Sequence, residues 1–178
     1  QPSDNIVIRY SMANRGAGGS VCGTETAGGI RNVYMHDCVF DGTDQAFRFK
    51  TLRPRGGGAE QIYIERVRAR LNGAAFYCNM LGSIKWGGDL AKRFPARKID
   101  EFTPDFRAIK INDVIIEDCC NLIDVDALPE RPLANVYISG ITANCKNFGK
   151  MRDVSSFTIK NARITTVDPV LTVAGCNG

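Results

Sequence analysis

The sequence has little histidine, tryptophan and proline, and it has no long apolar segment. One His and one Trp stand among 178 residues, and Pro occurs 7 times. No apolar run approaches the roughly 20 residues that a membrane-spanning helix needs, so we expect no membrane partner. Hydrophobic residues make up 44% and charged residues 24% of the chain, which is a globular composition.

The charge is mild, and the cysteines form no familiar metal or redox motif. Lys and Arg number 23 against 19 Asp and Glu, which gives a net charge of +4 without a clustered basic stripe. We therefore expect no nucleic-acid partner. The seven Cys include no C-x-x-C pair, so we expect neither a metal site nor a bound cofactor. Buried free thiols are the main expectation, and disulfides remain open.

A short pattern of alternating apolar residues recurs along the chain. It returns every 21 to 29 residues, apart from one gap of 52 that fits two turns with an insertion or one turn with a long loop. Alternation with period two predicts strands with one buried face. The six segments are Asn5–Ile8, Asn32–Met35, Gln61–Ile64, Asp113–Ile116, Asn135–Ile138 and Ser156–Ile159.

A second short strand often follows about ten residues later, as at 46–50, 75–78, 122–125 and 170–173. Short strands repeating in this way, separated by Gly, Asn and Asp, predict an all-β fold: one parallel β-helix domain over residues 1–178 with six to eight rungs. Cys38 and Cys119 each lie six residues after a segment start, so we place them at one inward repeat position. Vicinal Cys119 and Cys120 should point to opposite sides of a strand.

Residues 81–107 break the repeat. This insertion holds Trp86, two prolines and many charges. An insertion of this length is usually functional, so a lid or binding wall beside a cleft is one interpretation. A solvated loop that closes one side of the coil is the other, and the sequence does not decide between them.

Several motifs occur in the order and spacing seen in one enzyme family. They are residues 14–25 (NRGAGGSVCGTE), 28–33 (GGIRNV), 40–44 (FDGTD), 48–50 (RFK) and 102–107 (FTPDFR). This series resembles the pectin-degrading polygalacturonases of glycoside hydrolase family 28, over about residues 5–125. The resemblance implies a right-handed parallel β-helix, a pectin-type polysaccharide as partner, and a secreted or periplasmic location.

Two of the family's four active-site motifs have counterparts here. The family's Arg-Ile-Lys, whose basic residues hold the substrate carboxylate, corresponds to Arg48 and Lys50. Its Gly-His-Gly corresponds to Gly16, Ala17 and Gly18, so Ala17 stands at the His position. The motifs that carry the catalytic carboxylates, Asn-Thr-Asp and Asp-Asp, precede the Gly-His-Gly in the family, and no counterpart occurs before Gly16.

The missing motifs shape the functional expectation. Inverting hydrolysis of a glycosidic bond needs an acid and a base carboxyl group about 6.5–9.5 Å apart. We therefore expect no catalytic residue in this chain, which then forms the C-terminal, substrate-anchoring part of a larger pectinase. The alternatives are a catalytically silent β-helix that binds acidic glycans and a plain repeat scaffold. We also expect the first rung to pair with an N-terminal part, a second chain or another copy.

Other polar residues are weaker candidates. Glu25 is expected to bond a sugar hydroxyl beside Gly16 and Gly18, or else to accept turn amides. Asp41 and Asp44 are interpreted as turn residues rather than a catalytic pair, and His36 as a surface histidine. A basic surface that suits a polyanionic sugar is one interpretation of further cations, with a solvated loop as the other. These cations are Arg53, Arg55, Lys92, Arg93, Arg97 and Lys98.

Overall fold

Nearly all of the regular structure is β-strand. The computed structural model describes residues 1–177. The strands are β1 (Ser3–Arg9), β2 (Met12–Gly16), β3 (Ser20–Cys22), β4 (Ile30–Thr43), β5 (Phe47–Lys50), β6 (Gly58–Leu71), β7 (Ala74–Asn79), β8 (Asp105–Asp126), β9 (Leu133–Arg152), β10 (Val154–Lys160) and β11 (Arg163–Ala174). The short helix α1 (Ile84–Gly87) and the 3-10 turn η1 (Gly88–Ala91) lie in the predicted insertion.

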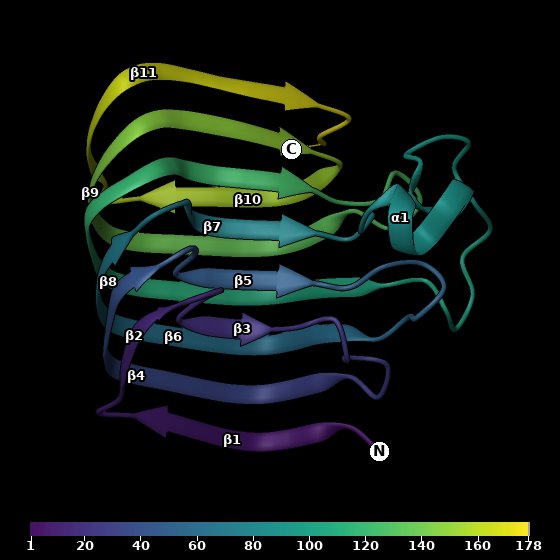
Figure 1. Cartoon of the computed structure of the whole chain (residues 1–178), viewed down its shortest axis with the longest axis horizontal. Helices are drawn as coiled ribbons and strands as arrows, with labels where there is room; N and C mark the ends of the chain where they lie inside the picture. Colours follow the sequence, from purple (N-terminus) through teal and green to yellow (C-terminus); the bar gives the residue numbers. More distant parts are fainter. Residues whose placement is uncertain (178) are drawn as a thin grey trace.

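The strands form one curled sheet in which all pairings are parallel, an arrangement consistent with a β-helix (Figure 1). Successive coils stack from β1 at one end to β11 at the other.

Three faces of the curled sheet are distinguished below. The first face comprises residues 6–9, 33–36, 62–65, 109–112, 136–139 and 157–160. The second begins at residues 12, 39, 68, 115, 142 and 163. The third comprises residues 20–22, 47–50, 76–79, 123–126, 149–152 and 171–174.

Residues in the left-handed backbone conformation flank the first face in every coil. Before its strands stand Asn5, Asn32, Gln61, Ala108, Asn135 and Ser156, with φ between 53° and 60°. After them stand Tyr10, Asp37, Arg66, Asp113, Gly140 and Asn161, with φ between 50° and 66°. Asn, Asp and Gly adopt this conformation most readily. These two columns bend the chain, which explains why the repeat segments so often begin with Asn.

The column before the first face corrects one assignment made from the sequence. Asp113 belongs to the column after the face, and Ala108 is the true equivalent of Gln61. The interval of 52 residues from Gln61 to Asp113 therefore contains one turn with a long loop. Cys38 pairs in register with Val67, whereas Cys119 pairs with Cys145. The two cysteines do not share a repeat position, so that prediction was wrong.

The cysteines otherwise behave as predicted. Cys119 is buried while Cys120 is partly exposed, so the vicinal pair points to opposite sides. All seven thiols are free, and five of them are buried. Burial raises the pKa of Cys22 and of Cys119 to about 12, so these thiols are packing groups rather than nucleophiles at neutral pH.

Inward side chains of like size meet their counterparts one coil above and below. Ile111 lies between Ile64 and Ile138 in register, and Ile111 and Ile64 are fully buried. On the third face Phe47 and Phe49 point inward, 2% and 1% exposed, as the alternation predicts. The first and third faces pack against each other, so their outer surfaces point away from one another. The Phe76 and Phe157 rings make this contact, with centroids 5.5 Å apart.

The apolar stack predicts unequal effects for two isoleucines on the same strand. Ile111→Ala removes a buried side chain between two coils and should lower the free energy of unfolding by about 2–5 kcal/mol. Ile115→Ala is the matched control, because Ile115 is 48% exposed. Urea unfolding followed by circular dichroism measures both. Equal losses would contradict the stacked core.

Candidate functional site

The two predicted anchoring cations lie side by side on the outer surface of the third face. Arg48 and Lys50 alternate on β5 with the buried Phe47 and Phe49, and both are partly exposed. None of the ion pairs within residues 1–177 includes either cation. Two adjacent cations without acidic partners are suited to hold a carboxylate.

The turn of residues 16–18 fixes the Arg48 side chain. Arg48 Nη1 donates to the carbonyl oxygen of Ala17 at 3.0 Å and to Gln45 Oε1 at 3.2 Å. Gly16 has φ +104°, which a side chain would strain, and a Cβ at residue 18 would lie 2.7 Å from Val21 Cγ2. The structure therefore brings Gly16, Ala17 and Gly18 together with Arg48, whose Nη1 makes the bond to Ala17.

Neighbouring strands add groups that the sequence did not single out. In register, Arg48 faces Tyr77 and Lys50 faces Asn79 on β7, and the Arg48 guanidinium carbon lies 5.6 Å from the Tyr77 ring centre. Burial is the main cause that raises the pKa of Tyr77, so its hydroxyl stays protonated. Parallel register was the signal that could have identified both residues, because each stands 29 residues after its partner.

Two carboxylates lie one strand further along the same surface. Asp124 and Asp126 on β8 pair with Tyr77 and Asn79 in register. Lys150 Nζ lies 3.4 Å from Asp124 and 2.8 Å from Asp126, and Arg152 Nε lies 3.1 Å from Asp126. Cations thus engage these carboxylates, which do not offer the free acid and base of a hydrolase. The expectation that this chain holds no catalytic residue stays a prediction.

Glu25 and most cations of the expected basic surface form ion pairs, which were not predicted from the sequence. Glu25 is 88% exposed on its side chain and pairs with Arg55. Lys92 pairs with Asp89, and Arg53 and Arg93 are engaged in the ion pairs described below. Four of the six cations thus have acidic partners, which reduces the positive charge they offer to a polyanionic sugar. Asp41 lies beside the bend at Gly42 (φ 71°), 3.8 Å from Arg70, and Asp44 is exposed.

The buried Arg53 and the partly buried Arg93 hold the insertion of residues 81–107 against the coil. Arg53 Nε and Nη2 each donate to Glu130 at 2.6 Å, and Nη1 donates to the carbonyl oxygens of Leu90 and Lys92 at 3.0 and 2.9 Å. From the insertion, Arg93 makes two 2.7 Å bonds to the buried Asp153. The insertion is thus fastened beyond the ends of β5 and β7 (Figure 1), which favours a fixed wall over a mobile lid.

The buried ion pair predicts a large loss of stability in one variant. The Arg53 and Glu130 side chains are 5% and 4% exposed. Arg53→Ala leaves a buried carboxylate unpaired and should cost about 3–5 kcal/mol of unfolding free energy. Lys92→Ala, which removes the exposed pair with Asp89, should cost about 0–1 kcal/mol. Denaturant unfolding compares the two variants, and similar small losses would show that the wall is loosely held.

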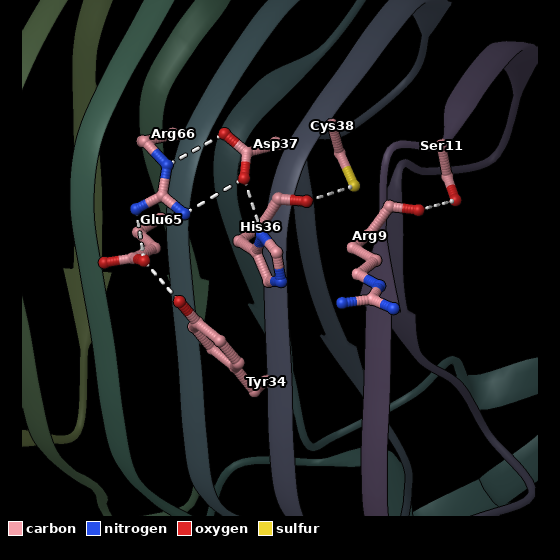
Figure 2. Close-up of polar contacts among 8 residues, drawn as sticks. All are labelled: Arg9, Ser11, Tyr34, His36, Asp37, Cys38, Glu65 and Arg66. Carbon is pink, nitrogen blue, oxygen red and sulfur yellow. Dashed lines mark hydrogen bonds and ion pairs between the residues drawn. The ribbon is translucent and has the colours of Figure 1, made fainter.

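His36 is not the surface histidine predicted from the sequence. It alternates out of the core as expected, yet it is only 8% exposed, because Tyr34 stacks on it at 4.6 Å and Tyr10 covers its edge at 5.6 Å. Its Nδ1 lies 2.5 Å from Asp37 Oδ2 (Figure 2). Arg66 donates to both oxygens of Asp37, at 2.8 and 3.0 Å, and also pairs with Glu65.

This network predicts a pH-dependent contribution from Asp37. Hydrogen bonds from Arg66, then from His36, hold the pKa of Asp37 well below its ordinary value. A depressed pKa stabilises the fold above the unfolded-state value of about 3.9 and loses that effect as the pH falls further. Asp37→Asn should therefore lower the thermal midpoint at pH 7, with a difference that shrinks below about pH 4.

Asp44→Asn is the control for this experiment, since Asp44 is exposed and belongs to none of the ion pairs in the described part of the chain. It should leave the thermal midpoint unchanged throughout. A difference between wild type and Asp37→Asn that is constant from pH 7 to pH 2 would rule out the ionic contribution.

Comparison with known proteins supports a polygalacturonase-like relationship. A curated protein from Vitis vinifera, described as a probable polygalacturonase, is 25% identical over 120 residues. The alignment covers 67% of this chain, which spans only 23% of that relative. No family model matches the chain. None of the helices in residues 1–177 is long and apolar enough to cross a membrane.

Proposed function

We propose that this chain is part of a pectin-acting, polygalacturonase-like glycoside hydrolase and supplies the side of the cleft that anchors the substrate. In this proposal the curled sheet is a segment of a right-handed parallel β-helix with six to eight rungs in this chain. The observation that carries it is the pair Arg48 and Lys50, outward on β5 and without acidic partners among the described residues.

The two cations would grip a uronic-acid carboxylate in complementary ways. Arg48 Nη1 is already bonded to Ala17, which leaves Nε and Nη2 for the two oxygens of a carboxylate. Lys50 adds a point charge two residues along the same surface. Tyr77 and Asn79 provide a ring and an amide for the rest of the sugar. Gly16 and Gly18 would let the backbone approach the sugar closely, and the exposed Glu25, paired with Arg55, would accept a hydrogen bond from a sugar hydroxyl.

Hydrolysis itself would depend on carboxyl groups outside this chain. Inversion needs a protonated carboxyl group for the leaving oxygen and a carboxylate that activates water on the opposite side of the bond. The proposed partners are therefore an acidic, pectin-like polysaccharide and the N-terminal part, or a second chain, that completes the coil. A secreted or periplasmic location follows from the same proposal.

A catalytically silent, glycan-binding β-helix is the second candidate. It is favoured by Ala17 at the position of the family's His, which removes the imidazole expected beside the reacting sugar. Incubation of the natural full-length protein with polygalacturonate, followed by a reducing-end assay, separates the two candidates. New reducing ends support the hydrolase, and binding without cleavage supports the silent coil.

The anchoring role predicts charge-selective loss of binding. The variant Arg48→Ala/Lys50→Ala should weaken trigalacturonate binding by at least about 100-fold, and Arg48→Ala alone by at least about 10-fold, because charged hydrogen bonds contribute about 1.5–3 kcal/mol each. Binding of neutral galactotriose should change little. Isothermal titration calorimetry measures both sugars. Arg48→Lys should recover only part of the loss, since an ammonium cannot form the two-pronged contact.

Lys146→Ala provides the matched control for this experiment. Lys146 is exposed on β9 and forms none of the ion pairs found in residues 1–177. Its removal alters the net charge without touching the third-face cations. If it weakens trigalacturonate binding as much as Arg48→Ala does, general charge attraction explains the binding and the anchoring role fails.

A further inference from the structure

A hollow lies on the outer side of the first face, away from Arg48 and Lys50. It has a volume of about 610 Å³ and spans β6, β8, β9 and β10. The polar and aromatic residues that line it are Tyr63, Lys110, Asn112, Asn135, Tyr137 and Thr158. Because the first and third faces pack on one another through the core, this hollow and the β5 cations open in different directions.

The register builds the hollow around a lysine between two tyrosines. Tyr63, Lys110 and Tyr137 occupy one outward column on successive strands. Asn112 donates to the Tyr63 hydroxyl at 3.0 Å, which fixes one ring, and Lys160 Nζ lies 5.9 Å from the Tyr137 ring centre. Lys110 therefore lies between the rings of Tyr63 and Tyr137 on the outer surface of the sheet.

Charge and polarity in the hollow point to an anionic sugar. No Asp or Glu lines it, and Lys110 is exposed and absent from the ion pairs of residues 1–177. Amides of Asn112 and Asn135 and the Thr158 hydroxyl supply donors and acceptors suited to sugar hydroxyls. Ring faces pack on the apolar faces of a pyranose, and a lysine attracts a carboxylate.

We propose that this hollow binds a uronic-acid oligosaccharide as a second, non-catalytic site. Lys110 holds the carboxylate, Tyr63 and Tyr137 flank the sugar ring, and the asparagines bond its hydroxyls. The choice of an acidic sugar rests on the proposed function, whereas the site itself shares no residue with the third-face cations. A long polysaccharide would thereby contact two surfaces of one molecule.

Counting binding sites tests this inference. Isothermal titration calorimetry of the full chain with trigalacturonate should resolve two sites. Lys110→Ala/Tyr137→Ala should weaken one site at least 10-fold and leave the other unchanged, and Arg48→Ala/Lys50→Ala should do the reverse. The control is Lys146→Ala/Tyr10→Ala, which removes an exposed lysine and a 75% exposed tyrosine elsewhere.

The outcomes separate the two proposals. Binding by Lys110→Ala/Tyr137→Ala that equals wild type overturns the second site, whatever the third-face variant does. Loss in this variant, combined with no effect of Arg48→Ala/Lys50→Ala, retains the second site and rejects the anchoring function. Equal loss in the control variant also overturns the second site, because charge and ring content alone would then explain binding.

Chemical labelling of lysines in the unmutated protein tests the inference even if Lys110→Ala/Tyr137→Ala does not fold. Lysine acetylation, quantified by mass spectrometry, should slow at Lys110 when trigalacturonate is added and stay constant at Lys146. Neutral galactotriose should protect Lys110 much less. Unchanged labelling of Lys110 at saturating trigalacturonate would overturn the inference.

Discussion

The structure depends on apolar side chains stacking in register from one coil to the next. Ile64, Ile111 and Ile138 each cover the next, so the core exists only where coils adjoin. Because every second residue of a strand must point into this core, the residues between them must point to solvent. Arg48 and Lys50 face solvent because Phe47 and Phe49 must face the core. The surface chemistry is thus organised in columns by the packing beneath it.

Much of this could be predicted from the sequence, because period-two alternation is a local property. The inward Phe47 and Phe49, the second strands at 46–50, 75–78, 122–125 and 170–173, and the opposite sides of Cys119 and Cys120 followed from it. The start of the fourth first-face strand did not. Both 109–111 and 114–116 have apolar residues two apart and follow a left-handed residue, Ala108 or Asp113, and only the pairing of Ile62 with Ile109 identifies the first-face strand. Alanine gives no sign of that conformation, whereas asparagine does.

Interactions between distant residues explain the remaining differences. His36 is covered by Tyr34, two residues away on β4, and by Tyr10, which meets it only once the coils are stacked. Arg53 and Glu130 lie 77 residues apart in the chain, and no local pattern links them. The candidate site likewise combines residues identified from the sequence with residues that only the strand register brings together. A motif resemblance singled out Arg48 and Lys50, while Tyr77 and Asn79 became neighbours through strand register alone.

The fastening of residues 81–107 has a consequence for how such a coil diversifies. Arg53 and Arg93 take their partners from Glu130 and Asp153, which lie outside the insertion. Residues 81–104 of the segment form no strand of the stack, and β6 and β7 before it both pair directly with β8 after it. Outside the bonded residues 90–93, changes of length or composition there leave the strand pairing of the stack unaltered. Sequence changes in this segment can therefore alter specificity while the stacked strands keep the same pairing.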